Sequence, residues 1–324
     1  MVAVFGDIRT EDDFTHPLGP EPNFNESMYY NFFDQGRGSG GFLRIGNRAN
    51  EGYAEVTLCL YLPTGEVLFN YQRPQISGND AMDAGGMRFE VLEPFAKHRT
   101  QYEGGAVFLT DPTQMADPSR AFRENPHKRV TLDLEHEALG PVYGRATGGE
   151  PEQADPEKQF ARAHYEQHMR VHGTMTIDGE MAEVDGAGLR DHSWGPRYWQ
   201  AIHSYRWLNC AFGPELAITV SEITPEPGVR NQGGVVIRDG KLELIRSVEL
   251  DTDFAPDTPY HRRMTASLGL EGGEQVALEG EVRGFIPLRN RRAQMVTHIG
   301  EGMTEYRCLG HVGYGISEYL DQVR

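Results

Sequence analysis

The side chains best suited to acid–base chemistry gather in one short segment, Gly186–Trp199. It contains an aspartate, a histidine, two arginines, two tryptophans and a tyrosine among four glycine or proline residues. Histidine is the side chain that changes charge near neutral pH. His192 and Trp194 are two residues apart, so they would face the same side of an extended chain. An indole face stabilises a nearby cation, so the pair predicts proton transfer to carbon.

The same segment also has a structural interpretation, which the residues alone leave open. Trp194 would then be a packing anchor at a corner between two domains, and Asp191 would pair with Arg190 or Arg197. Ionisable side chains are costly to bury unless they pair or take part in catalysis. The functional interpretation takes His192, Trp194 and Asp191 as catalytic residues.

Other motifs with known chemistry are absent or misleading. His164, His168 and His172 recur every four residues, but no HExxH motif accompanies them, and the alternation around them favours a strand with one polar face. If that face turned inward, His168 would line a cavity. The sequence Gly36–Gly41 fits G-x-G-x-x-G, yet a strand rather than a helix follows it, which favours a hairpin loop. We therefore expect no metal, nucleotide or flavin cofactor.

The elements around these residues alternate with period 2, which is typical of antiparallel strands. Glycine is frequent, with 38 residues in 324, and lies mostly in short turns. The first half predicts strands at 41–48, 53–62, 66–73, 87–93, 99–103 and 130–137, and one helical turn after Pro118. The acidic stretch Gly148–Glu157 is typical of a linker.

The second half predicts four hairpins with short turns. The predicted strand pairs are 205–212 with 215–223, 234–238 with 242–250, 263–270 with 275–287, and 293–300 with 303–309. So many strands joined by short turns favour a sandwich or an up-and-down barrel. We predict an all-β protein with two β domains, at 1–187 and 188–324.

Composition limits the partners and the compartment. The 48 acidic residues outnumber the 31 basic ones, and a net charge of −17 disfavours nucleic acid and anionic membranes. No apolar run is long enough to span a membrane as a helix. Three widely spaced cysteines cannot form a disulfide framework, and no secretory signal is visible. We expect a cytoplasmic protein.

The element Asp191-His192-Ser193-Trp194-Gly195 resembles the signature of the AttH-like and carotenoid 1,2-hydratase (hydroxyneurosporene synthase) superfamily. The stretches 27–34, 40–46 and 313–319 are similar to other parts of its members. The resemblance implies two consecutive lipocalin-like β-barrel domains and chemistry on apolar molecules. In the carotenoid hydratases a Tyr-x-Asp pair on a following strand joins the His-x-Trp pair. Here the strand 215–223 lacks it, and we take Glu222, the nearest acid, as a fourth candidate catalytic residue.

The predicted function is therefore hydration, dehydration, isomerisation or cyclisation of a terpenoid or polyketide-like molecule without a cofactor. Beside the catalytic residues, we expect five substrate-binding residues: Arg197, Tyr198, Trp199, Trp207 and His168. The alternatives are a non-catalytic carrier of lipophilic ligands and, less favoured, a domain for protein partners. The sequence does not indicate the oligomeric state.

Overall fold

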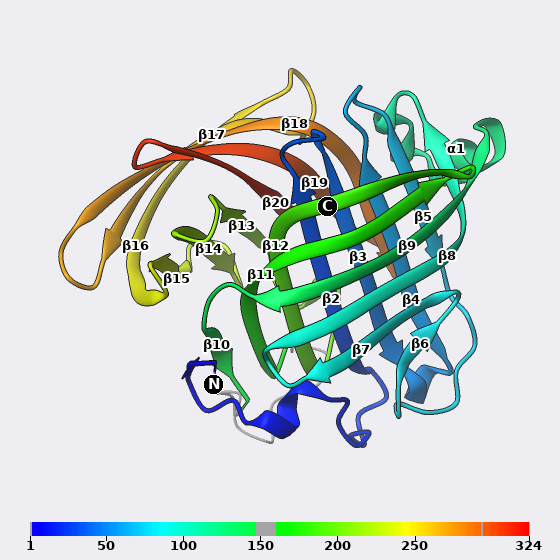
Figure 1. Cartoon of the computed structure of the whole chain (residues 1–324), viewed down its shortest axis with the longest axis horizontal. Coiled ribbons are helices and arrows are strands. Elements are labelled where there is room, and N and C mark those ends of the chain that lie inside the picture. The colour runs from blue at the N-terminus through cyan, green and yellow to red at the C-terminus, as the bar shows by residue number, and fades with distance from the viewer. Residues whose placement is uncertain (1, 147–159, 293, 324) are drawn as a thin grey trace. The chain divides into compact units, whose positions relative to one another are not determined.

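Two all-β units make up the chain in the computed structural model, which describes residues 2–146, 160–292 and 294–323 (Figure 1). The first unit comprises Met1–Leu60, Leu68–Phe108 and Asn125–Tyr198, and the second comprises Tyr61–Val67, Leu109–Glu124 and Trp199–Arg324. This division differs from a boundary between 187 and 188, because that position lies inside a strand of the first unit. The predicted linker at Gly148–Glu157 lies outside the described residues.

The first unit is built from twelve strands in one sheet. Because β9 pairs with both β11 and β8, eight of them form a closed ring in the order β11-β12-β2-β3-β4-β5-β8-β9. The strands are β1 (Val4–Phe5), β2 (Phe24–Asp34), β3 (Ser39–Arg48), β4 (Tyr53–Tyr61), β5 (Val67–Gln72), β6 (Met82–Ala84), β7 (Met87–Glu93), β8 (Lys97–Leu109), β9 (His127–Ala138), β10 (Val142–Arg145), β11 (Ala163–Ile177) and β12 (Glu180–Pro196). Two 3-10 turns belong to this unit, η1 (Thr10–Asp13) and η2 (Ala49–Glu51).

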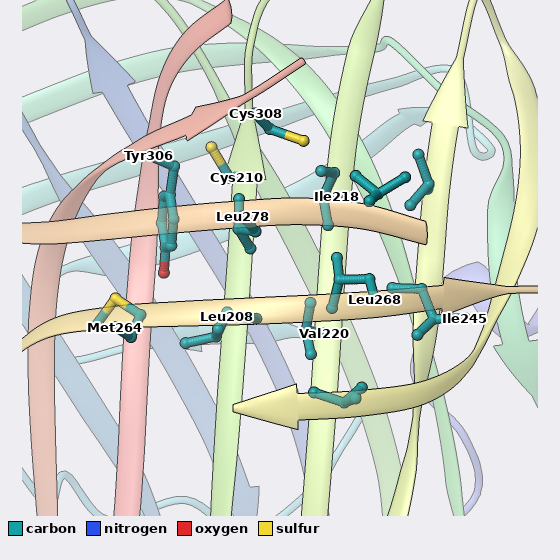
Figure 2. Close-up of a cluster of buried hydrophobic side chains, with 14 of the residues drawn as sticks. Leu208, Cys210, Ile218, Val220, Ile245, Met264, Leu268, Leu278, Tyr306 and Cys308 are labelled. Carbon is teal, nitrogen blue, oxygen red and sulfur yellow. The ribbon is translucent and has the colours of Figure 1, made fainter. Parts of the chain in front are cut away.

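The second unit is a closed barrel of eight antiparallel strands. Its strands are β13 (Ser204–Ala211), β14 (Leu216–Thr224), β15 (Asn231–Arg238), β16 (Lys241–Phe254), β17 (His261–Leu270), β18 (Gln275–Arg292), β19 (Met295–Cys308) and β20 (His311–Val323). The short helices are η3 (Pro112–Ala116), α1 (Pro118–Glu124) and η5 (Trp199–Ala201). All eight strands contribute apolar side chains to one buried cluster inside the barrel (Figure 2). The prediction of an all-β, lipocalin-like fold is confirmed.

Most predicted strands and turns are present, but one predicted hairpin is wrong. Glu301 and Gly302 do not turn the chain; they lie in the middle of β19, paired with Glu318 and Ser317 of β20. The turn comes at Leu309–Gly310, where both residues have positive φ. The G-x-G-x-x-G sequence joins β2 to β3 as a hairpin, which confirms that interpretation.

The segment Gly186–Trp199, which the structural interpretation placed at a corner between two domains, begins as the last part of the long strand β12 and continues past its end at Pro196. Two of its glycines, Gly186 and Gly188, serve close strand packing rather than turning: a Cβ at Gly188 would lie 1.9 Å from the carbonyl oxygen of Asn31. At Gly186 the corresponding distance, to the carbonyl oxygen of Phe33, is 2.1 Å. Both carbonyls belong to β2, so the glycines let β2 lie directly against β12.

Gly188→Ala should therefore lower the free energy of unfolding by about 1–3 kcal/mol, because backbone must move to accommodate the methyl group. A matched control is Gly105→Ala in β8, where a Cβ would have no heavy atom within 4 Å. The control should be neutral or slightly stabilising. Urea denaturation of both variants measures the difference. Equal midpoints for the two would contradict the close packing of β12 on β2.

Candidate active site

The Asp-His-Ser-Trp element divides its side chains between the two faces of the sheet. In the register of β11 with β12, Tyr165 pairs with His192 and Glu166 pairs with Asp191. Successive side chains of a strand point to opposite faces. His192 and Trp194 thus share one face with Tyr165, whereas Asp191 lies on the other face with Glu166. The element therefore takes part in two separate clusters of ionisable side chains, one on each face of the sheet.

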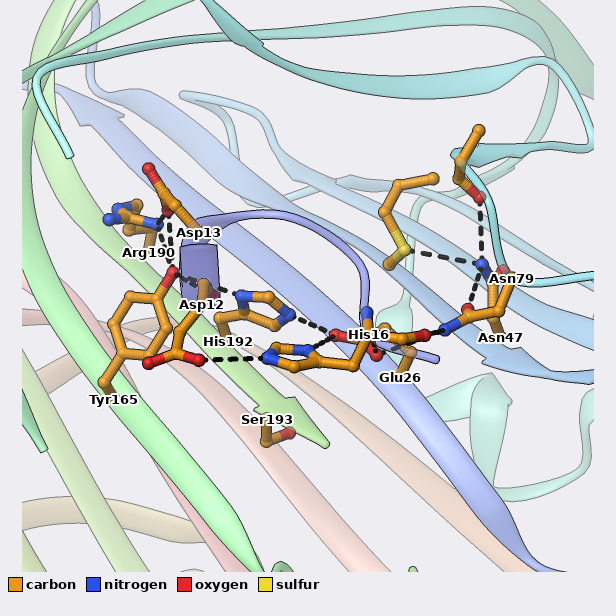
Figure 3. A network of polar contacts seen from close by, with 12 residues as sticks. Asp12, Asp13, His16, Glu26, Asn47, Asn79, Tyr165, Arg190, His192 and Ser193 are labelled. Atoms are coloured by element: carbon orange, nitrogen blue, oxygen red, sulfur yellow. Dashed lines mark hydrogen bonds and ion pairs between the residues drawn. The ribbon is translucent and has the colours of Figure 1, made fainter. Parts of the chain in front are cut away.

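On the first face, His192 is buried against a carboxylate (Figure 3). Its Nε2 lies 2.5 Å from Oε1 of Glu26, and Nδ1 of His16 lies 3.0 Å from the same oxygen. The ring of His16 stacks on Trp194, with centroids 3.9 Å apart and an interplanar angle of 14°. Burial alone would lower the pKa of His16, but Glu26 and Asp12 raise it above its ordinary value. One indole face of Trp194 is therefore occupied by a protein side chain.

A second buried group extends this network. Asp13 accepts hydrogen bonds from Nη1 of Arg190 at 2.6 Å and from the hydroxyl of Tyr165 at 2.7 Å. Nε2 of His98 lies 3.1 Å from the same carboxylate. Burial raises the pKa of Asp13, but Arg190 and His98 outweigh it and hold the pKa well below its usual range. Asp13 thus remains charged and ties the N-terminal segment to β12.

On the second face, His164 contacts Asp191 through Nε2, and Glu166 Oε1 lies 3.5 Å from the same nitrogen. Solvent reaches 41% of the His164 side chain, 16% of Asp191 and 6% of Glu166. Burial lowers the pKa of His164, but Asp191 raises it above the ordinary value. Burial raises the pKa of Asp191, and His164 in turn lowers it. This imidazole–carboxylate pair can exchange a proton with a molecule in solution.

The pair predicts a measurable pKa change. Asp191→Asn removes the charge that raises the pKa of His164, so the pKa of this histidine should fall. Titration of the imidazole C–H resonances by NMR measures it, with His164→Gln used to assign the signal. An unchanged titration of His164 in Asp191→Asn would contradict the pairing.

The remaining predicted residues lie in different places. His168 is buried on the same face of β11 as His164, and burial lowers its pKa to about 3. Arg197 donates from Nη2 to Oγ of Ser193, and Tyr198 follows it at the end of the first unit. Three predicted residues belong to the second unit: Glu222, Trp199 and Trp207. Glu222 accepts a hydrogen bond from Gln232 at 2.7 Å. The roles of all these residues, like those of His192 and Trp194, stay predictions.

Trp194 has a clear packing partner, and this gives a stability prediction. Trp194→Ala removes the ring that stacks on His16 and should lower the free energy of unfolding by about 3 kcal/mol. Trp194→Phe keeps a stacking ring and should cost less than half as much. Thermal or urea denaturation measures both. If Trp194→Ala leaves the midpoint unchanged, the stacking contributes nothing to stability.

The described part of the chain also contains a hollow of about 480 Å³ on β6–β9. Charged residues contribute to its lining, including Arg88, Glu103, Arg129 and Asp133. Neither His164 nor His192 lines this hollow.

Sequence reasoning missed the partners that decide what the motif does. His16, Glu26 and Asp13 come from the N-terminal segment and from β2, more than 150 residues before β12. No spacing in the sequence links them to His192. The pairing of His164 with Asp191 was accessible in principle, because β11 and β12 form a hairpin whose register the turn at Asp178–Gly179 sets.

Comparison with known proteins now places the chain in a family. A family described as "Domain of unknown function (DUF7064)" matches residues 9–323. The chain belongs to this family. No curated protein matches its sequence. Among the described residues, no helix is long and apolar enough to cross a membrane.

Solved structures share the fold of this DUF7064 protein. A protein described as AttH, from Nitrosomonas europaea, is similar with a TM-score of 0.66 and 14% identity over 98% of this chain and 97% of that one. CghA with Sch210972 gives 0.56 and 13%, over 93% and 89%. Kievitone hydratase from Nectria haematococca gives 0.55 and 11%, over 99% and 98%. The resemblance to the AttH-like superfamily is confirmed at the level of the fold.

Proposed function

We propose that the protein is an enzyme that transfers protons to and from carbon in an apolar small molecule, by hydration, dehydration, isomerisation or cyclisation. The observation that carries this proposal is the pair of His164 and Asp191. It combines a histidine of raised pKa with a carboxylate of lowered pKa, and solvent reaches both side chains. The names of two structural neighbours, kievitone hydratase and CghA with Sch210972, support chemistry on small molecules.

The pair has the arrangement that acid–base catalysis needs. Asp191 engages Nε2 of His164 and fixes the ring, which leaves Nδ1 for the substrate. In hydration, Nδ1–H of the imidazolium gives its proton to one alkene carbon, and the π electrons form the new C–H bond. Water adds to the cationic carbon left behind, and Nδ1 takes a proton from that water. The net change is addition of one water molecule, and the imidazolium is regenerated.

The sequence analysis assigned proton transfer to His192. The present proposal assigns it to His164, on the opposite face of β11 and β12. His192 is 1% exposed and lies between Glu26 and Tyr165, whereas solvent reaches 41% of the His164 side chain. In this proposal Asp191 is a positioning residue that orients the imidazole of His164. Terpenoid and polyketide-like molecules remain the proposed substrate class.

The experiment is incubation of the purified protein with a panel of terpenes, polyketides and kievitone, followed by mass spectrometry of the extracted compounds. An enzyme of this kind returns a product that differs by one water molecule or is an isomer separated by chromatography. A carrier binds a compound and returns it unchanged. Binding without conversion across this panel would contradict the enzymatic proposal and favour the carrier.

A further inference from the structure

The network around Glu26 holds three carboxylates and two imidazole rings. Asp13 contacts the guanidinium of Arg190, whereas Asp12 and Glu26 contact the imidazole rings of His16 and His192. The two rings lie on either side of the same Glu26 oxygen, with centroids 5.7 Å apart. A divalent cation placed between these three side chains would bring positive charge to a carboxylate that no guanidinium contacts in the described contacts of Glu26.

The hydrogen-bond partners of His192 determine which of its two ring nitrogens carries a hydrogen. The hydroxyl of Tyr165 has one hydrogen, which it donates to Asp13, and it accepts from Nη1 of Arg190 at 3.1 Å. The contact of 3.1 Å between that hydroxyl and Nδ1 of His192 therefore needs a hydrogen on Nδ1. In a neutral His192 the lone pair is then on Nε2, and it points at Oε1 of Glu26.

His16 is arranged in the same way. Its Nε2 lies 3.4 Å from Oδ1 of Asp12, where an N–H can donate, and its Nδ1 lies 3.0 Å from Oε1 of Glu26. Two imidazole nitrogens and one carboxylate oxygen thus converge within 4.8 Å of one another (Figure 3). Each imidazole also has an outer partner on its other nitrogen, as the histidines of metal sites ordinarily do.

We propose that His16, Glu26 and His192 bind one divalent transition-metal ion, with zinc the best match to two imidazoles and one carboxylate. His16 binds through Nδ1, His192 through Nε2 and Glu26 through Oε1. Tetrahedral coordination at about 2.0–2.1 Å places ligand atoms roughly 3.3 Å apart. The two histidine–Glu26 distances, 3.0 and 2.5 Å, reach this value with small side-chain rotations. Asp12 and Tyr165 fix the two rings from outside.

The bound ion ties the N-terminal segment, which carries His16, to strands β2 and β12. This site is separate from the His164–Asp191 pair, which lies on the opposite face of β11 and β12. The proposal therefore stands or falls independently of the proposed catalysis.

The test is metal binding by the full-length protein after dialysis against a chelator. Zn²⁺ is titrated by calorimetry, and Co²⁺ is titrated by its visible absorption, in the parent, His16→Phe, Glu26→Gln and His164→Gln. His16→Phe keeps a ring to stack on Trp194 but cannot bind metal. His164→Gln is the matched control, since His164, Glu166 and Asp191 form the other cluster of possible ligands in the described residues.

We expect one equivalent in the parent and in His164→Gln, with affinity more than about 100-fold weaker in His16→Phe and Glu26→Gln. Asp12→Asn should weaken binding about 10–100-fold through the outer partner. Added Zn²⁺ should also raise the melting temperature of the parent but not of His16→Phe. No stoichiometric binding by the parent, or binding lost in His164→Gln and kept in His16→Phe, would overturn the proposal. If His16→Phe does not fold, the circular-dichroism-checked Glu26→Gln and Asp12→Asn variants decide.

Discussion

Replacing His164 with glutamine is expected to lower turnover by about 10²–10⁴-fold, the usual contribution of a positioned proton donor. Glutamine keeps the size and hydrogen bonding of the side chain but cannot carry a proton. Because His164 is partly exposed at the surface of β11, folding and ligand affinity should change little. Turnover, ligand affinity and the unfolding midpoint of this variant are measured against the parent with the same substrate.

The matched control is His192→Gln, which lies on the adjacent strand β12 but on the opposite face of the sheet. It should lower stability, because His192 contacts Glu26 and Tyr165 in the buried network, while the folded protein keeps turnover within about tenfold of the parent. The reverse pattern, with turnover lost in His192→Gln and retained in His164→Gln, would return the catalytic role to His192. Asp191→Asn should fall between the two, since it acts by orienting His164.

Replacing Asp13 with asparagine is expected to lower the free energy of unfolding by about 3–5 kcal/mol, because it leaves the guanidinium of Arg190 buried without its counter-charge. The side chains of Asp13 and Arg190 are 0% and 2% exposed. The surface pair Arg99–Asp133 is the control: both side chains are more than a third exposed, so Asp133→Asn should cost about 0–1 kcal/mol. Urea denaturation measures both variants.

The pH dependence follows from the sign of the pKa change. The pKa of Asp13 is lower in the folded state than in the unfolded state. Its contribution to stability is therefore present above the ordinary aspartate pKa, about 3.9, and is lost as the pH falls below that value. Because asparagine does not titrate, the Asp13→Asn variant should lack this part of the stability loss as the pH falls below about 3.9. Equal stability of Asp13→Asn and the parent at pH 7 would contradict the buried ion pair.

Local patterns in the sequence predicted most of the fold. Alternation and turn residues predict β7 at Met87–Glu93 and the hairpin of β15 with β16, because each depends on neighbours in the sequence. Where a turn signal competes with strand pairing, pairing decides: Glu301-Gly302 stays extended because β18 and β20 bind β19 on both sides. The close packing at Gly186 and Gly188 could not be predicted locally either, because the carbonyl groups that leave no room for a side chain belong to β2.

The candidate site was predicted only in part. The motif drew attention to Asp191, His192 and Trp194, and all three lie in contact with ionisable or aromatic partners. The sequence did not reveal that alternation would separate Asp191 from the other two. It also could not reveal His16, Glu26 or Asp13, because these contacts depend on how the N-terminal segment meets β12 across more than 150 residues.

Transfer of solvent hydrogen to carbon tests the central claim most directly. The parent protein is incubated in deuterium oxide with an alkene that it hydrates, and the product is examined by mass spectrometry for deuterium bound to carbon. If His164 and Asp191 transfer the proton, the parent yields product carrying one carbon-bound deuterium, folded His192→Gln does the same, and His164→Gln yields almost none. Product formed by the parent without carbon-bound deuterium, or equal labelling by His164→Gln, would contradict this account.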